Sequence, residues 1–398
     1  MDGKLRPIKG TLPLVIEAKN KGFKEIFLPK ENAEEAGIIS GIQIFPAKDL
    51  KEVLDHLSNN TNFKIKTQPK TEILINQNFD IDFNDIKGQQ NTKRSLEIAA
   101  GGGHNIAMWG PAGTGKTLLA KAFPSILPPL SFNEILEVTS IHSISGNLND
   151  NLITNPPFRN PHHTSSYVSI IGGGAIPKPG EATLAHRGVL FLDEFPEFDR
   201  KVIDTLREPL EEKIVRISRA KGSAKFPANF ILIAALNPCP CGNWGSKTKI
   251  CKCQPILIEK YKRKISGPII DRIDLWSEVS SFDHTTLGEN KKSGESSEII
   301  RKRILEARKI QLNRFDKEKD IKTNSEVGAK KINELIPLTT EVKKILDRAS
   351  SVLDLSARSY HKIIKIARTI ADLDQKEVIA NEHMEEALQY RPKNFKYD

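Results

Sequence analysis

Three short apolar runs stand out in the middle of the chain. Residues 106–109, 189–192 and 230–236 are wholly hydrophobic, and each run is bounded by residues that favour turns. Runs of this length are typical of strands that are buried on both faces, and here helical patterns separate them. Strands that alternate with helices form parallel sheets with crossover helices, so the pattern predicts an α/β fold over residues 81–283.

The first 62 residues have the pattern of a smaller α/β segment. Helical spacing at 12–24 and 50–57 alternates with apolar runs at 25–28 and 42–45, which predict strands. A segment of this length buries little core by itself, and it begins almost at once on structured sequence. We therefore expect that part of a domain, preceding this segment, is missing.

Polar stretches separate the main α/β block from its neighbours. We expect residues 63–80 to form a linker and residues 284–298 to form a connector. Helical spacing then continues to about residue 390, which predicts a helical lid over residues 299–398 with helices that start near Pro337 and Ser356.

A long stretch inside the α/β block interrupts the alternation of strands and helices. Residues 140–185 contain many Asn, Gly, Pro and His residues, including Gly172-Gly-Gly174. The stretch is longer than an ordinary loop, so we interpret it as an insertion with a function of its own.

Composition narrows the class of protein. The 398 residues carry a net charge of +10, and most of the excess falls after residue 290. This charge fits a nucleic-acid partner and fits a lysine-rich solvated surface equally well. The chain has no run of 18 apolar residues and no apolar signal segment at its start, so we expect a cytoplasmic protein without a membrane span. Four cysteines in so long a chain do not indicate a disulfide scaffold.

A glycine-rich segment follows the first apolar run directly. Residues 110–117 match G-x-x-x-x-G-K-T, the phosphate loop found between a strand and a helix. Backbone N–H groups of such a loop face a triphosphate, Lys116 can reach the β- and γ-phosphates, and the Thr117 hydroxyl can bind Mg²⁺. The predicted nucleotide-binding residues are Gly110, Pro111, Ala112, Gly113, Thr114, Gly115, Lys116 and Thr117. This segment places the chain among nucleoside triphosphatases.

Polar residues end the other two apolar runs. Asp193 and Glu194 have the arrangement of a Walker B element, in which Asp193 can hold Mg²⁺ and Glu194 can polarise the attacking water. Asn237 either positions that water and senses the γ-phosphate or forms a turn before Pro238. We expect Lys116, Asp193 and Glu194 to converge from two adjacent strand ends on one magnesium-bound triphosphate.

The order of these elements, with a helical lid after them, resembles that of AAA+ ATPases, and longer strings resemble one family of them. The strings are Pro161-His-His-Thr164, Gly172-Gly-Gly174, Pro179-Gly-Glu181, Leu184-Ala-His-Arg-Gly-Val-Leu-Phe-Leu-Asp-Glu194, Asn237-Pro-Cys-Pro-Cys-Gly242 and Ser266-Gly-Pro-Ile-Ile-Asp-Arg-Ile-Asp-Leu275. They are similar to strings of the YifB/ComM family, which is called magnesium-chelatase-like for its ATPase core. The resemblance covers nearly the whole chain and implies an AAA+ P-loop core, a parallel sheet with flanking helices, followed by a C-terminal helical lid.

The resemblance also assigns roles to two segments of the core. Residues 140–185 are similar to a helix-2 insert, and residues 216–225 are similar to a presensor-1 β-hairpin, which grips DNA in related ring helicases. An exposed basic hairpin without a ligand is the local alternative. The residues implied to contact DNA are Arg216, Arg219, Lys221 and Lys225.

Two arginines are given roles at the nucleotide by the same resemblance. Arg272 is similar to an arginine finger that a neighbouring subunit supplies, whereas an ion pair with Asp271 or Asp274 is the local alternative. Arg358 is similar to a sensor-2 residue, which touches the nucleotide and couples the lid angle to its state. A finger that acts in trans requires an oligomer, and the family implies a hexameric ring.

The cysteines and two histidines are candidates for metal binding. Cys239-x-Cys241 and Cys251-x-Cys253 could bind Zn²⁺ tetrahedrally, but zinc knuckles usually have two residues between paired cysteines, so reduced free thiols stay open. His162 and His163 have no evident third ligand. For them we favour a structural role or one near DNA.

Residues 1–62 resemble the second half of a Lon-protease-like domain, so the fold expected for them is a partial domain of that kind. Leu12 stands where the catalytic lysine of a Lon protease follows a Pro-Ile-Gly-Gly turn, and the half that would carry the serine lies outside the sequence. The resemblance therefore implies no peptidase activity.

The family resemblance implies a function in recombination. We expect an ATP-hydrolysing ring motor that acts on single-stranded or branched DNA, because ComM-type relatives promote branch migration during recombination of incoming DNA. A chelatase-type motor subunit, a protein-remodelling motor and an inactive remnant stay open as alternatives. The expected cofactors are ATP and Mg²⁺, with Zn²⁺ if the cysteines bind it.

Overall fold

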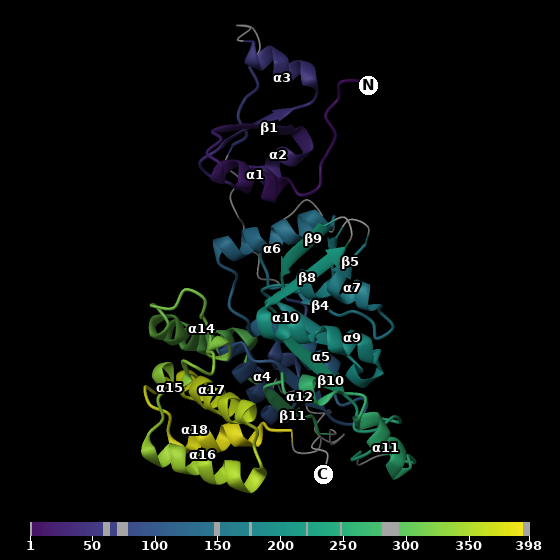
Figure 1. The fold of residues 1–398 in the computed structure, drawn as a ribbon, viewed down its shortest axis with the longest axis vertical. Helices are drawn as coiled ribbons and strands as arrows, with labels where there is room; N and C mark the ends of the chain where they lie inside the picture. The colour runs from purple at the N-terminus through teal and green to yellow at the C-terminus, as the bar shows by residue number, and fades with distance from the viewer. Residues whose placement is uncertain are drawn as a thin grey trace.

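The computed structural model has three parts arranged along its long axis (Figure 1). It describes residues 2–58, 64–69, 79–146, 152–174, 177–219, 222–246, 249–280 and 294–392, and the structural statements below concern these residues. A small N-terminal unit lies at one end, an α/β core follows it, and a helical domain packs beside the core at the other end.

A five-stranded sheet forms the centre of the core. Its strands are β3 (Ile106–Trp109), β4 (Phe158–Arg159), β7 (Val189–Leu192), β10 (Ile231–Leu236) and β11 (Leu275–Glu278). They lie in the order β11-β3-β10-β7-β4, and every neighbouring pair is parallel. The prediction of an α/β fold with a parallel sheet is therefore confirmed, and the three predicted strands are β3, β7 and β10.

The stretch interpreted as an insertion, residues 140–185, contains one strand of this sheet. The stretch holds the end of α6 (Phe132–Ser145), then β4, α7 (Tyr167–Ile171), the short antiparallel pair β5 (Gly172–Gly173) and β6 (Lys178–Pro179), and α8 (Glu181–Leu184). β4 pairs with β7 at the edge of the sheet and is two residues long. A strand this short has no apolar run to mark it, which is why the sequence pattern did not predict it.

Both faces of the sheet are covered, as its apolar strands require. In β10, Ile233 and Ala235 belong to one buried cluster, and Leu232 and Ala234 belong to another. The covering elements of the core are η2 (Phe83–Asp85), α4 (Gln90–Gly102), α5 (Lys116–Ala122), η3 (Phe123–Ile126), η4 (Phe195–Glu197), α9 (Arg200–Thr205), α10 (Arg207–Glu212), the hairpin β8 (Ile214–Arg219) and β9 (Gly222–Pro227), α11 (Pro255–Lys262) and α12 (Gly267–Ile270).

The helical domain shares the first of these clusters with the core. It contains α14 (Ser297–Arg314), η5 (Asn324–Glu326), α15 (Ile332–Leu335), α16 (Thr340–Leu353), α17 (Ala357–Leu373) and α18 (Asn381–Gln389). Ile304 of α14 and Ile370 of α17 are fully buried in the cluster that also holds Leu96 of α4. The sheet and the helical domain are therefore joined by one continuous core.

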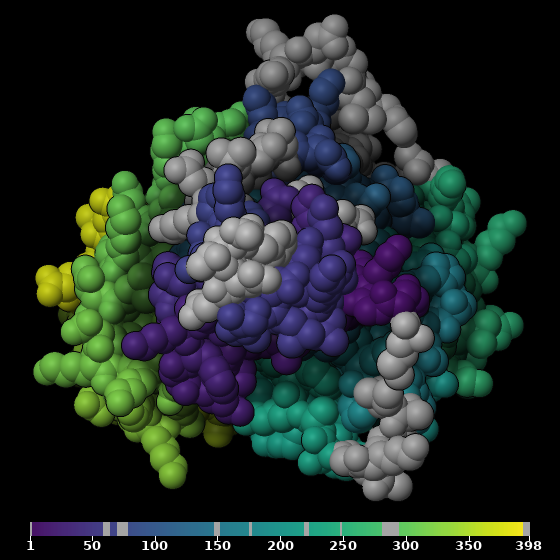
Figure 2. Space-filling model, turned by 90° about the horizontal axis from the view of Figure 1, so that it is seen from above, coloured from purple at the N-terminus to yellow at the C-terminus, as the bar shows by residue number. Residues whose placement is uncertain are grey.

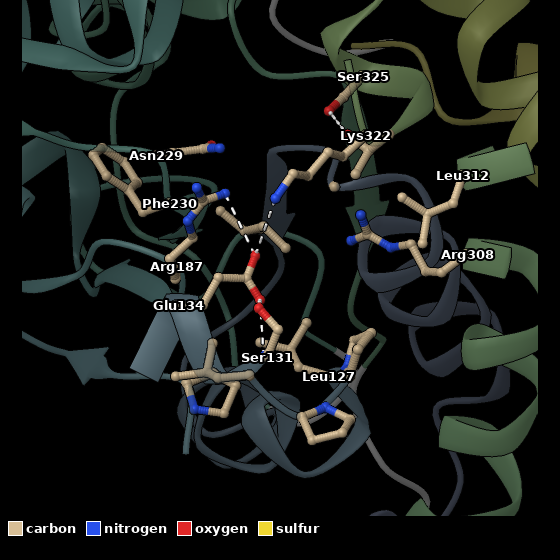
Figure 3. Close-up of a pocket in the computed structure, with 18 of the residues that line it drawn as sticks. Leu127, Ser131, Glu134, Arg187, Asn229, Phe230, Arg308, Leu312, Lys322 and Ser325 are labelled. Carbon is tan, nitrogen blue, oxygen red and sulfur yellow. Dashed lines mark hydrogen bonds and ion pairs between the residues drawn. The ribbon is translucent and has the colours of Figure 1, made fainter. Parts of the chain in front are cut away.

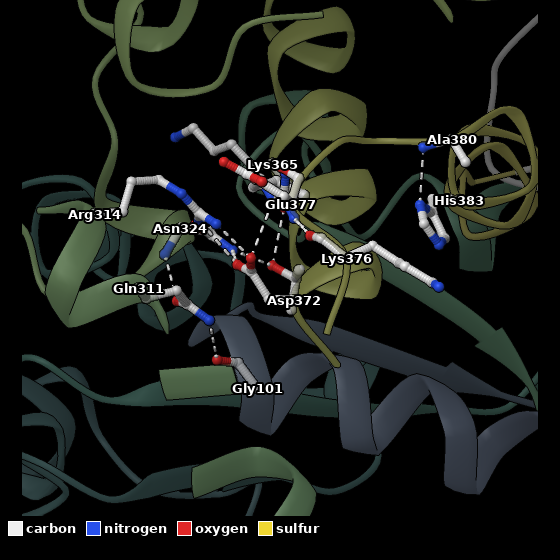
Figure 4. Close-up of polar contacts among 12 residues, drawn as sticks. Gly101, Gln311, Arg314, Asn324, Lys365, Asp372, Lys376, Glu377, Ala380 and His383 are labelled. Atoms are coloured by element: carbon white, nitrogen blue, oxygen red, sulfur yellow. Dashed lines mark hydrogen bonds and ion pairs between the residues drawn. The ribbon is translucent and has the colours of Figure 1, made fainter. Parts of the chain in front are cut away.

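A buried polar network fixes the helices of this domain to one another and to α4 (Figure 4). Asp372 is fully buried and accepts hydrogen bonds from Asn324 Nδ2 (2.8 Å), Arg314 Nη1 (3.0 Å) and Arg368 Nε (3.1 Å). Gln311 Nε2 donates to the carbonyl oxygen of Gly101, at 3.0 Å. The network pairs a buried charge and links α14, α17 and α4.

The N-terminal unit has its own small core. It contains α1 (Thr11–Asn20), the parallel pair β1 (Glu25–Pro29) and β2 (Gln43–Ala47), η1 (Lys30–Asn32), α2 (Ala33–Ala36) and α3 (Leu50–Leu57). Leu136 of α6 packs against its buried cluster, and the Gly10 N–H donates to Ser143 Oγ at 3.1 Å. Figure 2, which looks down on this unit, shows it over the centre of that face, with the helical domain at one side.

Two predicted helix boundaries differ from the observed ones. α1 ends at Asn20 rather than at 24, because Gly22 adopts the left-handed conformation (φ 84°) that commonly ends helices. α16 starts at Thr340 rather than at Pro337, because Thr339 Oγ1 accepts the Val342 N–H and caps the helix. None of the described helices combines the length and apolar character needed to cross a membrane.

Candidate nucleotide-binding site

The phosphate loop lies between β3 and α5, at the carboxyl edge of the sheet. Gly113 and Gly115 have φ values of 77° and 88°, which residues with side chains rarely adopt, and they turn the chain into α5. The Gly110 N–H donates to the Leu236 carbonyl at the end of β10, at 3.2 Å. Thr114 Oγ1 donates to the Pro111 carbonyl, at 3.0 Å. The loop is therefore held both to the neighbouring strand and to itself.

Lys116 points back into the loop. Its Nζ donates to the carbonyl oxygens of Gly110 (2.7 Å) and Pro111 (2.8 Å) and to Asn237 Oδ1 (3.2 Å). Burial lowers the pKa of Lys116 to about 8, and the charge of Asp193 opposes this only in part. The structure thus brings together the lysine of the phosphate loop and the asparagine that ends β10.

Thr117 and Asp193 meet on the other side of Asn237. Thr117 Oγ1 donates to Asp193 Oδ2 at 2.7 Å. We expected Lys116 and the acidic pair to converge from adjacent strands, but β10 lies between β3 and β7 in the sheet. The intervening strand carries Asn237, so this amide lies between the lysine and the carboxylate.

Glu194 follows Asp193 in a backbone conformation that is unusual for its type. Its φ is 50°, and its N–H donates to Asp193 Oδ1 at 2.9 Å. Its carboxylate Oε2 lies 3.3 Å from Nδ1 of His163, which follows β4 at the same edge of the sheet. His163 also packs against the ring of His162, with 4.2 Å between the ring centroids. The side chain next to Glu194 is therefore a histidine from the 140–185 stretch.

His163 was considered in the sequence only as a structural residue, one near DNA or a weak metal candidate. Its contact with Glu194 was missed, because β4, which positions it, has no recognisable pattern. Its place shortly after a strand of a parallel sheet is the one signal that could have found it. In the described part of the chain, neither His162 nor His163 belongs to a cluster of three or more potential metal ligands.

Arg272 and Arg358 both bind Glu211. Arg272, just after α12, places Nη2 2.7 Å from Glu211 Oε1, and Arg358, in the first turn of α17, binds the same oxygen. Hydrogen bonding from Arg272, with Arg358 adding to it, lowers the pKa of Glu211. The partner of Arg272 in the chain is thus Glu211 rather than Asp271 or Asp274.

The two arginines line a cavity of about 470 Å³ that lies between the core and the helical domain. Lys213, Lys362 and Lys365 also line it, whereas no residue of the 110–117 loop does. Among the described contacts, neither Arg272 nor Arg358 reaches the phosphate loop of its own chain.

The basic hairpin is an antiparallel pair, in which Arg216 is opposite Lys225. Arg216 forms ion pairs with Glu208 and Glu212 of α10, both at 2.6 Å, and Lys225 is exposed. Arg219 lies in β8, but its side chain is outside the described part, and Lys221 lies outside the described residues altogether. The hairpin geometry agrees with its interpretation, but one of its four cations is paired within the chain.

The four cysteine side chains gather in one place after β10. Their Sγ atoms all lie within 4.8 Å of one another. The printed separations are 3.4 Å for Cys239–Cys241, 3.7 Å for Cys239–Cys251 and 3.7 Å for Cys241–Cys251. Disulfide sulfurs would be about 2.05 Å apart, whereas four sulfurs at about 2.3 Å from a tetrahedral Zn²⁺ are about 3.8 Å apart.

A second cavity, of about 460 Å³, lies far from the phosphate loop in the sheet (Figure 3). Gly188 and Ile231, at the amino ends of β7 and β10, line it together with residues of the helical domain. Glu134 projects into it, accepts the Ser131 N–H at 3.0 Å and lies 3.7 Å from both Arg187 Nη1 and Lys322 Nζ. Its lining contains none of the predicted nucleotide-binding residues.

Comparisons with known proteins agree with this architecture. Residues 82–287 match the family described as magnesium chelatase, subunit ChlI, and residues 294–391 match the family described as magnesium chelatase, subunit ChlI C-terminal. Fold and matches together define an AAA+ core of the magnesium-chelatase type with a C-terminal helical domain.

Two relatives match almost the whole chain. Competence protein ComM of Haemophilus influenzae is 40% identical over 394 residues, which are 98% of this chain and 76% of that protein. YifB of Escherichia coli is 38% identical over 392 residues, 98% of this chain and 75% of that protein. Magnesium-chelatase subunit ChlI of Mesostigma viride matches less, at 28% identity over 153 residues, 37% of this chain and 39% of that one. The chain therefore belongs to the ComM/YifB family of magnesium-chelatase-like AAA+ proteins.

Proposed function

We propose that the protein is an ATP-hydrolysing ring motor that acts on DNA, as a ComM-like branch-migration helicase. The observation that carries the ATPase part is the meeting of Lys116, Asn237, Thr117 and Asp193 at the carboxyl edge of the sheet. ComM/YifB membership and the name of its competence relative support the DNA part.

The donor atoms of the site fit ATP and Mg²⁺. Mg²⁺ prefers oxygen ligands, and the Thr117 hydroxyl and Asp193 carboxylate would hold it. The ion would supply charge neutralisation at the β- and γ-phosphate oxygens. Lys116 would exchange its loop carbonyls for phosphate oxygens, and the loop from Gly110 to Thr117 would present its N–H groups to them.

Glu194 is the proposed general base. Its carboxylate would take a proton from the attacking water, Asn237 would orient that water, and His163 would position the carboxylate. His163 acts through Glu194 in this proposal, so it is a positioning residue rather than a catalytic one.

The two arginines on Glu211 are proposed to serve the nucleotide of a neighbouring subunit. Arg272 would be the finger and Arg358 the sensor, and their separation from the phosphate loop of their own chain supports a role in trans. A site completed in this way requires a homo-oligomer, and the family indicates a hexameric ring.

DNA contacts are proposed for Arg216, Arg219, Lys221 and Lys225 of the hairpin. Cations on a hairpin can follow the phosphate backbone of a strand without reading its sequence. Single-stranded or branched DNA is the expected substrate, and the ion pairs of Arg216 with α10 would exchange for phosphate contacts.

Zn²⁺ is proposed as a structural ion at Cys239, Cys241, Cys251 and Cys253. The three sulfur separations of 3.4–3.7 Å are close to those of a tetrahedral tetrathiolate. The backbone N–H of Asn243, with the neighbouring thiols, lowers the pKa of Cys241 to about 6, so this thiol is ready to ionise as a metal ligand must.

One experiment tests the motor proposal as a whole. ATP hydrolysis by the full chain is measured with and without forked DNA, and its size is measured in the presence of ATP. We expect DNA to stimulate hydrolysis and ATP to favour a ring. Hydrolysis that neither single-stranded nor branched DNA changes would contradict the DNA part.

A chelatase-type motor is the second candidate, because both magnesium-chelatase family models match the chain. It shares the ATP site with the first and differs in its partner. Capture of a porphyrin-binding protein by the purified chain, without DNA stimulation, would favour it. Nucleotide-dependent unfolding of a tagged protein would instead favour a protein-remodelling motor.

A further inference from the structure

The cysteine cluster lies directly against the phosphate loop. The Gly242 carbonyl accepts the Ala112 N–H at 2.9 Å, and Gly242 N donates to the Cys239 carbonyl at 3.0 Å. The turn from Cys239 to Gly242 therefore begins at a cysteine and ends in a hydrogen bond to the phosphate loop.

The contact between the two loops is close. Gly242 has a φ of 74°, and a Cβ atom added to it would lie 3.0 Å from the Cβ of Ala112. A side chain at position 242 would push the loops apart. The turn also follows Asn237 after one intervening residue, so the cysteine that begins it is near the amide that contacts Lys116.

Little besides the cysteines holds the segment that carries them. Between Asn237 and Gln254, the described residues form no helix or strand. Ile250, next to Cys251, is 86% exposed, and Trp244 is 43% exposed. Apolar burial is small here, whereas the four sulfurs converge and the Trp244 N–H donates to Cys239 Sγ at 3.3 Å. Cross-linking of the sulfurs through one ion is the strongest constraint that this segment can have.

We propose that the metal bound by the four cysteines braces the phosphate loop, so that its occupancy sets the affinity for nucleotide. This inference rests on the proposed zinc and nucleotide sites and connects them. With the ion bound, the turn is fixed and its Gly242 carbonyl holds the Ala112 N–H. Without it, the turn relaxes and the phosphate loop loses one of its anchors, so ordering the loop adds to the cost of binding a triphosphate.

The experiment compares zinc content and nucleotide affinity in three variants of the full chain. C251S/C253S removes the two ligands farther along the chain from the phosphate loop, Ile250→Ser is its matched control, and Gly242→Ala keeps all four cysteines but opens the contact. Zinc is measured by elemental analysis, affinity by the fluorescence of an ATP analogue, and folding by circular dichroism.

We expect one zinc per wild-type chain, little in C251S/C253S, and the full amount in Ile250→Ser and Gly242→Ala. Affinity should fall about tenfold in C251S/C253S and in Gly242→Ala, the change expected when a hydrogen bond that orders the loop is lost, and should stay unchanged in Ile250→Ser. Restored zinc should restore the affinity of zinc-depleted wild-type protein.

Three results would overturn the brace, and they differ from failure of the sites themselves. Wild-type protein that binds nucleotide but no zinc removes the metal and leaves the motor proposal standing. Zinc that is lost in C251S/C253S at unchanged affinity separates the two sites. If C251S/C253S unfolds, Gly242→Ala decides, and full zinc with wild-type affinity in that variant rejects the proposal. Wild-type protein that binds zinc but no nucleotide contradicts the motor proposal first.

Discussion

The guanidinium of Arg272 lies 2.7 Å from the carboxylate of Glu211, and Arg358 from the helical domain shares that carboxylate. One acidic side chain of α10 thereby orients two cations that come from different parts of the chain. If both serve a neighbouring subunit, Glu211 fixes their positions before the ring closes.

Glu211→Gln tests this arrangement. Loss of the charge leaves the two arginines near each other without their counter-ion, so their positions should spread. We expect hydrolysis by the assembled protein to fall by about tenfold, the effect of misplacing a charged group at a transition state. Nucleotide affinity of the dilute chain should not change. Glu212→Gln on the same helix, assayed without DNA, is the control and should keep full turnover. A weaker nucleotide affinity with normal turnover would place the arginines at the wrong step.

Lys116→Ala and Glu194→Gln separate binding from turnover. Lys116 is buried and donates to two loop carbonyls, so its loss removes the charge closest to the phosphates. We expect nucleotide affinity to fall by about 30-fold or more. Glu194→Gln keeps the shape but cannot accept a proton, so binding should persist while turnover falls about 10²- to 10⁴-fold. Full turnover in Glu194→Gln would show that another group is the base.

His163→Ala tests the contact with Glu194. The imidazole lies 3.3 Å from the carboxylate, so without it Glu194 should be less well oriented and turnover should fall by about tenfold at unchanged nucleotide affinity. In the double variant with Glu194→Gln, His163→Ala should cause no further loss, because it acts through that side chain. His162→Ala is the control, since the Nδ1 of His162 contacts Thr164 Oγ1 at 2.9 Å. Additive losses in the double variant would contradict a positioning role.

Nucleotide affinity should depend on pH through Lys116. Its pKa is lowered to about 8 by burial in the nucleotide-free chain, and phosphate binding favours the charged form, which raises the pKa in the complex. Above pH 8, binding must therefore take up a proton, and affinity should fall by up to about tenfold per pH unit. Affinity measured between pH 7.5 and 9.5 checks this. Lys116→Arg, which stays charged over this range, should show weaker but pH-independent binding.

The strand ends that carry the candidate site could be predicted from the sequence because their signals are local. The apolar run at 106–109 adjoins a phosphate loop, and the run at 189–192 ends in Asp193 and Glu194, so a few consecutive residues contain both structure and chemistry. Each of these runs is buried on both faces of the sheet, and this burial produces the continuous apolar pattern.

The contacts that were missed join segments with no such pattern. β4 is two residues long, so nothing in the sequence places His163 next to Glu194. Glu211 is one of several acids on α10, and only the packing of α17 against the core selects it as the partner of Arg358. The hydrogen bond from Ala112 to Gly242 joins two loops, whose conformations follow from long-range contacts rather than from periodicity.

Removal of the Asp372 carboxylate should loosen the helical domain. This fully buried group accepts from Arg314, Arg368 and Asn324, and Asp372→Ala would leave two arginines without their counter-charge. Loss of one partner of a buried ion pair costs about 3–5 kcal/mol, so α17 should open far more often. Hydrogen exchange of α17 amides measures that opening free energy directly.

The matched control for Asp372→Ala is Asp374→Asn, two residues along the chain. Asp374 has a side chain that is 43% exposed and pairs with Arg94 at 3.4 Å, so its loss should cost less than about 1 kcal/mol. Since α17 also carries Arg358 in its first turn, opening of this helix should release that arginine from Glu211. Asp372→Ala should therefore lower turnover of the assembled protein while nucleotide affinity, determined by the core, stays near the wild-type value. Equal protection of α17 in Asp372→Ala and Asp374→Asn would show that apolar packing against α4, rather than this network, holds the domain.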